Sequence, residues 1–180
     1  MAKLFEYCNT EDNDRAKIYG IYWGAQTFTP VVMHIITGVT LLLCKGWQDS
    51  PGTVTVSIRA TDEDGKPTGN DLCAGTTNGN TLPDDLPYEW RHIAFTSGYT
   101  LIAGTKYAIV VRALSGTSTE YIMWREVTPG TYNTGCECDS EDSGETWTKY
   151  EGGGIFSDFD YMFEDWGVRG KGPLPLHFRQ

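Results

Sequence analysis

The chain has 180 residues, 14 of them basic and 24 acidic, and a net charge of −10. This length favours one domain, and the acidity argues against nucleic acid and anionic membrane surfaces as partners, because both bind basic side chains. Aromatic residues make up 13% of the chain and there are 21 glycines, a composition typical of all-β proteins.

The first 20 residues are polar and of mixed charge, and we expect them to form an N-terminal arm with at most one helical turn over 12–18. They contain no apolar stretch of the kind that a secretory signal requires. The longest apolar-leaning stretch, 31–44, includes His34 and Thr37 and is too short and too polar to insert into a membrane. We therefore expect a protein made in the cytoplasm without a signal peptide.

From residue 22 onward the pattern is that of short β-strands. The clearest strand is 53–60, where Val54, Val56 and Ile58 alternate with polar side chains at the period of two. In chain order, further strands are predicted at 22–28, 35–45, 88–96, 107–113, 120–128 and 160–166, with weaker candidates at 71–76, 100–102 and 146–150. Turn residues separate them and no window carries a helical stripe. The predicted fold is all-β, a single β-sandwich of jelly-roll type over 21–167 with extended N- and C-terminal arms.

Three of the six tryptophans are candidates for binding. Trp47 lies in a polar turn, Trp90 faces away from the apolar side of its strand, and Trp124 precedes Arg125. Exposed aromatic rings beside charged groups suit a sugar, which needs an apolar face and hydrogen-bonding edges. They suit a protein interface equally well, so both glycans and partner proteins stay open as ligands of Trp47, Trp90, Trp124 and Arg125.

The five cysteines, at 8, 44, 73, 136 and 138, are odd in number, and we expect reduced thiols, with Cys44 and Cys73 buried as small hydrophobic residues. Cys136 and Cys138 are the only close pair. A soft metal there would need a further ligand, and no histidine is near in the sequence.

Residues 140–147, SEDSGETW, match the S-x-D-x-G-x-T-W pattern called the Asp box. In this motif an aspartate caps backbone amides of a tight turn and a glycine supplies positive φ. Asp boxes recur once per blade in sialidase propellers, but one copy in 180 residues cannot make a six-bladed propeller. We interpret Ser140, Asp142, Gly144, Thr146 and Trp147 as a structural hairpin and not as a glycosidase signature.

Acidic residues are dense in this hairpin, with five within 137–145, and again at 62–64. Asp62, Asp64, Asp139 and Asp142 are the candidates for a structural calcium ion, with solvated surface charge as the alternative. No other cofactor is expected. The three histidines, 34, 92 and 177, have no recognisable catalytic partner motif. We expect no catalytic residues and no enzyme, although paired acids leave a hydrolase as a further alternative.

The C-terminal residues 168–180 contain three basic residues and no acid. Of the chain's 14 basic and 24 acidic residues, 11 basic and all 24 acidic ones precede residue 168, a net charge of −13. Prolines exclude a helix, and the apolar residues alternate with other residues, so an extended segment would place them on one side. The arm could pack on its own domain, dock on a neighbouring copy or make a crystal contact; opposite charge favours the neighbouring copy and a homo-oligomer. Its candidate assembly residues are Arg169, Lys171, Leu174, Leu176, Phe178 and Arg179.

Six segments in a fixed order resemble a known family. They are 25–30 (AQTFTP), 36–43 (ITGVTLLL), 51–58 (PGTVTVSI), 65–69 (GKPTG), 101–111 (LIAGTKYAIVV) and the single Asp box. Together, over 21–167, they resemble the choice-of-anchor jelly-roll modules of bacterial surface proteins and similar phage virion proteins. The resemblance implies a non-catalytic sandwich for display, adhesion or glycan contact, and no catalytic residues to carry over.

These observations lead to one functional expectation and two alternatives. We expect a non-catalytic structural or adhesion module in a surface assembly, namely a phage or virus decoration, fibre or tail-associated protein that contacts other assembly proteins. The first alternative is a carbohydrate-binding module of a bacterial surface protein. The less favoured one is a glycan-active hydrolase.

Overall fold

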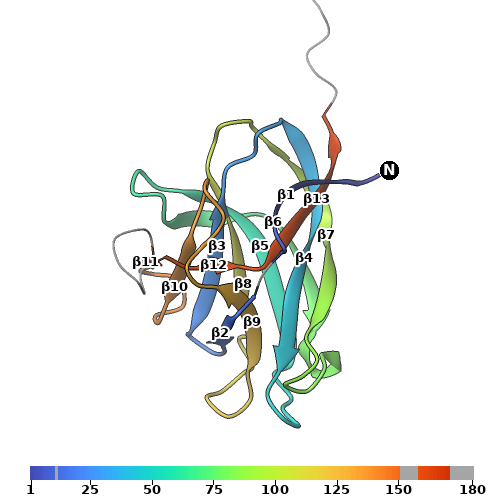
Figure 1. Cartoon of the computed structure of the whole chain (residues 1–180), viewed down its shortest axis with the longest axis vertical. Coiled ribbons are helices and arrows are strands. Elements are labelled where there is room, and N and C mark those ends of the chain that lie inside the picture. The colour runs from blue at the N-terminus through green and yellow to red at the C-terminus, as the bar shows by residue number, and fades with distance from the viewer. Residues whose placement is uncertain (11, 151–157, 171–180) are drawn as a thin grey trace, which may run out of the picture.

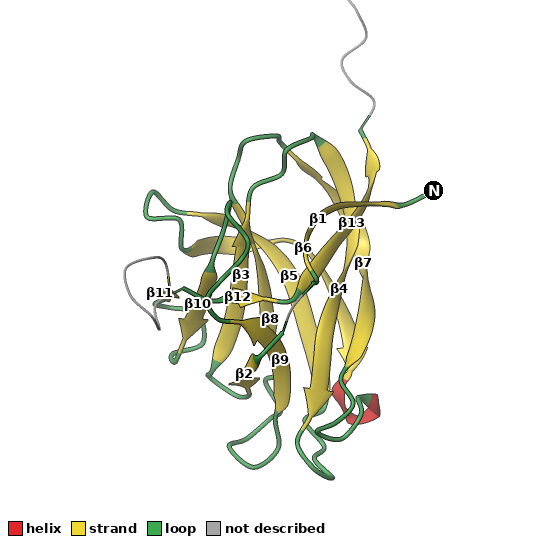
Figure 2. Cartoon of the chain, viewed as in Figure 1, coloured by secondary structure: helices red, strands yellow, loops and turns green. Residues whose placement is uncertain are grey.

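Two antiparallel β-sheets pack face to face in the computed structural model, which describes residues 1–10, 12–150 and 158–170 (Figures 1 and 2). The prediction of an all-β sandwich is confirmed, whereas the jelly-roll topology stays a prediction. The described residues contain one helical element, the 3-10 turn η1 (Gly79–Thr81). None of their helical structure has the length and apolar character that crossing a membrane requires.

The seven-stranded sheet is organised around the long strand β4 (His34–Lys45). Along the main path, β1 (Lys3–Cys8), β13 (Phe163–Arg169), β4, β9 (Ile122–Val127) and β12 (Asp160–Tyr161) follow one another. In addition, β7 (Glu89–Leu101) pairs with β4, and β2 (Asp14–Ile18) pairs with β9. Strand β4 therefore has neighbours along its whole length, which explains why nearly all its residues are buried.

The six-stranded sheet contains, in order, β11 (Thr148–Tyr150), β10 (Glu137–Ser140), β3 (Trp23–Phe28), β8 (Tyr107–Arg112), β5 (Thr53–Thr61) and β6 (Pro67–Asn78). The alternation read from the sequence has the expected effect in β5, where Val54, Val56 and Ile58 are fully buried. Strand β8 is apolar on both faces and lies between β3 and β5.

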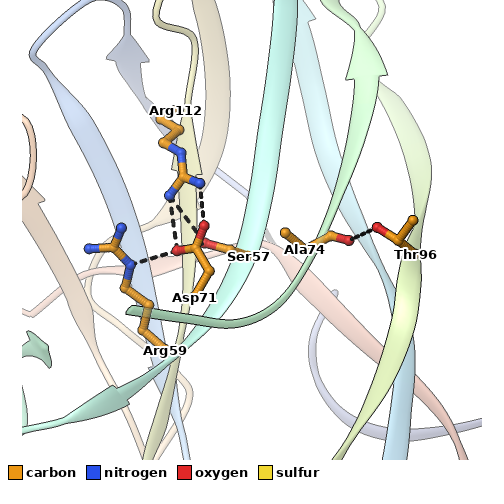
Figure 3. A network of polar contacts seen from close by, with 6 residues as sticks. All are labelled: Ser57, Arg59, Asp71, Ala74, Thr96 and Arg112. Atoms are coloured by element: carbon orange, nitrogen blue, oxygen red, sulfur yellow. Dashed lines mark hydrogen bonds and ion pairs between the residues drawn. The ribbon is translucent and has the colours of Figure 1, made fainter. Parts of the chain in front are cut away.

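The two sheets approach each other closely where β6 lies next to β7. Thr96 Oγ1 donates a hydrogen bond to the carbonyl oxygen of Ala74 at 2.8 Å, which joins the sheets directly (Figure 3). A Cβ atom at Gly75 would lie 2.2 Å from the carbonyl oxygen of Ala94, so this approach requires glycine.

The N-terminal region differs from the prediction, because residues 1–20 form two strands of the seven-stranded sheet in place of an arm. Strand β2 also replaces the helical turn expected over 12–18. It pairs with β9 over five residues and buries Ile18 to 1% exposure. Pairing with β9 satisfies backbone groups that a single helical turn would leave open, and tertiary contact decides the conformation.

The C-terminal boundary also shifts. Strand β13 continues to Arg169, two residues beyond the predicted end of the domain, and pairs Arg169 with His34. Five of the six residues assigned to the assembly arm, Lys171, Leu174, Leu176, Phe178 and Arg179, lie outside the described residues.

Candidate functional site

The most exposed tryptophan lies on one of two loops that are held together. Trp47 is 72% exposed in the loop after β4, and Leu86 is 72% exposed in the loop before β7. Between these loops, Lys45 N donates to Pro83 O at 3.0 Å, Asp85 N donates to Lys45 O at 2.9 Å, and Lys45 Nζ forms an ion pair with Asp84. We call the surface formed by Trp47 and Leu86 the tryptophan end.

Next to this end, the outer face of the seven-stranded sheet carries a cluster of aromatic and basic side chains. Trp90 is 40% exposed in β7, two residues after Tyr88. The Arg125 guanidinium lies 4.5 Å from the centroid of the Tyr88 ring, and Arg15 Nη1 donates to the Tyr88 hydroxyl at 3.3 Å. Asp12 accepts from Arg125 Nε at 2.5 Å. Two of the predicted binding residues, Trp90 and Arg125, therefore belong to one face.

The prediction that Trp124 is a surface residue is wrong. Its side chain is fully buried, its ring stacks on Tyr161 at a centroid distance of 4.1 Å, and its Nε1 donates to Met162 O at 2.8 Å. Strand β9 has neighbours on both edges, and its alternation points Trp124 into the core and Arg125 outward.

The Asp-box residues close the hairpin between β10 and β11. Asp142 accepts from Thr146 N at 2.8 Å and from Thr146 Oγ1 at 2.6 Å, and Ser140 Oγ accepts from Gly144 N at 2.8 Å. Gly144 has φ +83°, and Trp147 is buried beneath the turn at 7% exposure. The hydrogen bonds from Thr146 lower the pKa of Asp142, so this carboxylate is occupied by its own turn.

The structure does not bring the four calcium candidates together. Asp62 accepts from Lys66 N at 2.8 Å in the β5–β6 turn, and Asp64 O accepts from Lys149 Nζ at 2.8 Å. Asp139 accepts from the Tyr161 hydroxyl at 2.8 Å, while Asp142 serves the Asp box. Within 1–10, 12–150 and 158–170, no three His, Cys, Asp or Glu residues are arranged to hold a metal ion.

Three other carboxyl groups gather between β9 and β10, and we call them the buried acid chain: Glu126, Glu137 and Asp139. Glu126 and Glu137 are 5% and 4% exposed, and the Oε2 atom of each has no hydrogen-bond partner. Glu137 is within hydrogen-bonding reach of both neighbours. None of the ion pairs among the described residues includes a member of this chain.

Burial controls the ionisation of this chain. It raises the pKa of Glu126 to about 7, and it raises the pKa of Glu137 well above its usual range with help from the charge of Glu126. Burial also raises the pKa of Asp139, but hydrogen bonds from Tyr161 and Glu137 oppose that effect. Glu137 is therefore the member most readily protonated, and its protonated form can donate a hydrogen bond to a neighbouring carboxylate.

A cluster of one aspartate, two arginines and one serine lies on the outer face of the six-stranded sheet (Figure 3). Asp71 of β6 accepts from Arg59 Nε at 2.8 Å, from Ser57 Oγ at 2.9 Å and from both terminal nitrogens of Arg112. Burial alone would raise the pKa of Asp71, but the hydrogen bonds from Arg112, Arg59 and Ser57 hold it well below its usual range. Side chains of β5 and β8 bind Asp71 of β6, so the cluster holds these three strands together, and we call it the clamp.

All five cysteines are buried, which confirms the prediction made for Cys44 and Cys73. Burial raises the pKa of Cys8 to about 11 and the pKa values of Cys44 and Cys73 to about 12, which makes these thiols poor nucleophiles. Cys136 and Cys138 pack with Trp147 in a second, smaller hydrophobic cluster.

Sequence reasoning missed Tyr88, Arg15 and Leu86, which join the binding candidates only through pairing between distant strands. It also missed Glu126 and Glu137, because the sequence does not distinguish a buried glutamate from one on the solvated surface. Comparison with known proteins does not change this assignment: no protein-family model matches the chain, and the curated proteins contain no match to it.

Proposed function

We propose that this chain is a non-catalytic binding module of a surface assembly, best fitted to a virion decoration, fibre or tail-associated role, in which the tryptophan end contacts a neighbouring copy. The observation that carries the proposal is the exposure of Trp47 and Leu86 on adjoining loops. Large apolar side chains gathered at one place on a surface mark interaction sites, and tryptophan contributes strongly to binding energy there.

The clasp between the two loops supports this proposal. The ion pair of Lys45 with Asp84 and the two backbone hydrogen bonds of Lys45 fix both loops before any partner arrives. A preorganised surface loses less conformational entropy on association, so the same contact area gives a higher affinity.

The arrangement of acids gives less support to a hydrolase. Glycoside hydrolysis requires two carboxyl groups that flank a bound sugar. Glu126 and Glu137 are almost completely buried and face each other, so that pair is not available to a substrate.

Self-association tests the proposal. We expect sedimentation velocity of the full chain to give a mass that rises with concentration, up to about 100 μM, where weak contacts become populated. The double variant Trp47→Ala/Leu86→Ala should weaken association at least about tenfold, because it removes both apolar side chains. Leu114→Ala, at an exposed leucine on another loop, is the matched control and should associate like the wild type. A wild-type chain that stays monomeric throughout would contradict the proposal.

The basic C-terminal segment offers a second test of the same assembly. Its Lys171 and Arg179 and its alternating apolar residues complement the acidic remainder of the chain. A chain ending at Gly170 should associate more weakly than the full chain, with a smaller effect at high salt because exposed charges are screened. Unchanged association at low salt would exclude the segment from the contact.

Glycan binding is a second candidate, favoured by the exposed face of Trp90 beside Tyr88, Arg15 and Arg125. Its test is a glycan array probed with the wild type, Trp90→Ala and Leu114→Ala. We expect Trp90→Ala alone to lose the signal, since it removes the stacking surface. If the wild type binds no glycan, this candidate fails while the assembly proposal stands.

A further inference from the structure

Residues on and beside β2, β3, β10 and β11 line a small hollow, and Figure 1 shows where these strands lie. Its volume is about 100 Å³, enough for roughly three water molecules. Its walls combine three aromatic rings with two carboxyl groups and one amine: Tyr22, Trp23, Tyr150, Asp139, Glu141 and Lys17. This composition differs from that of both surfaces described above; the nearest link to them is β2, which contributes Arg15 to the aromatic and basic cluster and Lys17 to the hollow.

The aromatic wall is fixed in place by contacts from three directions. Trp23 Nε1 donates to Gly20 O at 3.0 Å, and the guanidinium groups of Arg59 and Arg112 lie 5.5 and 5.3 Å from the Trp23 ring centroid. On the Asp-box side, a Cβ atom at Gly144 would lie only 2.7 Å from the same ring. The ring therefore needs no rearrangement to receive a ligand.

Among the described residues, the two carboxyl groups of the hollow form no ion pair with a base. Asp139 is oriented by the Tyr161 hydroxyl at 2.8 Å and lies two residues after Glu137 in β10. No ion pair among the described residues involves Asp139 or Glu141. The one amine at the hollow, Lys17 Nζ, lies 4.0 Å from the centroid of the Tyr121 ring, where it has an aromatic partner of its own.

Aromatic rings and carboxyl groups, which line this hollow together, are the groups that recognise an organic cation. Aromatic rings attract cations through their negative faces, and the attraction is larger where water is excluded. A carboxylate adds charge-assisted hydrogen bonds to N–H donors. We infer that this hollow is a binding site for a protonated primary amine, of the kind carried by a lysine side chain or an amino sugar.

An NMR titration of the full chain with four probes tests the inference. The amines are Nα-acetyl-lysine methylamide and glucosamine, and their neutral counterparts are the Nε-acetylated lysine derivative and N-acetylglucosamine. We expect an amine to shift the backbone signals of Tyr22, Asp139 and Tyr150 in a saturable way, and acetylation to weaken binding at least about tenfold because it removes the charge. The amine that binds more tightly identifies the source. Equal binding of charged and neutral probes, or no saturable shift with either amine, would overturn the inference.

Matched variants separate charge recognition from general contact. Asp139→Asn keeps an acceptor for Tyr161 and should weaken amine binding about tenfold, and Glu141→Gln at the rim should weaken it about threefold. Lys17→Met should strengthen amine binding about threefold, because it removes a like charge; weaker binding by this variant would point to an anionic ligand and contradict the inference. Glu145→Gln, an exposed acid outside the hollow, is the control. Trp47→Ala/Leu86→Ala should leave amine binding unchanged, so the inference can fail independently of the assembly proposal.

Discussion

Two groups of carboxylates in this protein have opposite surroundings. Asp71 lies among Arg59, Arg112 and Ser57 on the outer face of one sheet, and its pKa is held low. Glu126 and Glu137 lie between the sheets, neither forms an ion pair within the described part of the chain, and burial raises their pKa values. Residue type alone therefore does not set the charge of a side chain, because the neighbouring strands determine its burial and its partners.

The two groups make stability depend on pH in opposite directions. Asp71 has a folded pKa below its unfolded value, so its contribution is present at neutral pH and is lost as the pH falls into the acid range. Glu126 has a folded pKa of about 7, above its usual value near 4.5. Its protonated form suits the fold, and the free energy of unfolding therefore decreases as the pH rises from about 5 through 7.

The largest expected effect concerns a third environment, a buried aspartate paired with histidine. His34 Nδ1–H donates to Val32 O, and His34 Nε2 forms a hydrogen bond with Asp165 Oδ2 at an N···O distance of 2.8 Å. Both side chains are fully buried. His34→Ala leaves Asp165 unpaired and should lower the free energy of unfolding by about 3–5 kcal/mol, measured by chemical denaturation. A loss below about 1 kcal/mol would show that the pair is not needed to hold Asp165 in the core.

Removal of Asp71 should lower the free energy of unfolding somewhat less than His34→Ala does. Asp71→Ala leaves two guanidinium groups facing each other without a carboxylate, at a site that is partly solvated. We expect a loss of about 2 kcal/mol at pH 7, and almost none at a pH low enough to protonate Asp71. Thermal melts can compare it with Glu63→Ala, an exposed acid of the same hairpin, which should behave like the wild type. An equal loss for both variants would contradict the clamp.

Removing charge from the unpaired side should stabilise the protein. Glu126→Gln prevents ionisation of a buried group, and at pH 8 it should raise the free energy of unfolding by roughly 1–2 kcal/mol. At pH 5 the wild-type side chain is already protonated in the fold, so the difference should be close to zero. Denaturation curves at both pH values check this prediction; destabilisation at pH 8 would mean that a positive group stabilises the ionised Glu126.

The smallest effect is expected in the Asp box, where the carboxylate serves only its own turn. Asp142→Ala removes the acceptor for both donors of Thr146 and should lower stability slightly, as the loss of a helix cap does. Glu145→Ala, in the same hairpin but exposed, should change it by less than about 0.5 kcal/mol. The difference in melting temperature between the two variants is the measurement, and identical values would contradict the turn's contribution.

How far the site could be predicted depended on how local its determinants were. The Asp-box turn and the outward orientation of Trp90 follow from spacing within a few residues. The sequence predicts a surface position for both Trp124 and Arg125, but only Arg125 lies on the outer face. The reason is that β2 and β4 flank β9 and fix which side faces the core. Residues 3–8 and 14–18 contain no pattern that predicts their pairing with distant strands.

The sequence by itself determined the class of the fold: β-branched residues, alternation as in β5 and frequent turns produce a sandwich, since such strands bury their apolar faces against a second sheet. Tertiary structure alone decided which polar groups met. It placed arginines around Asp71, glutamates beside one another, and three aromatic rings around Asp139, because each of these groupings joins strands far apart in the chain, and side-chain charge and orientation depend on those neighbours.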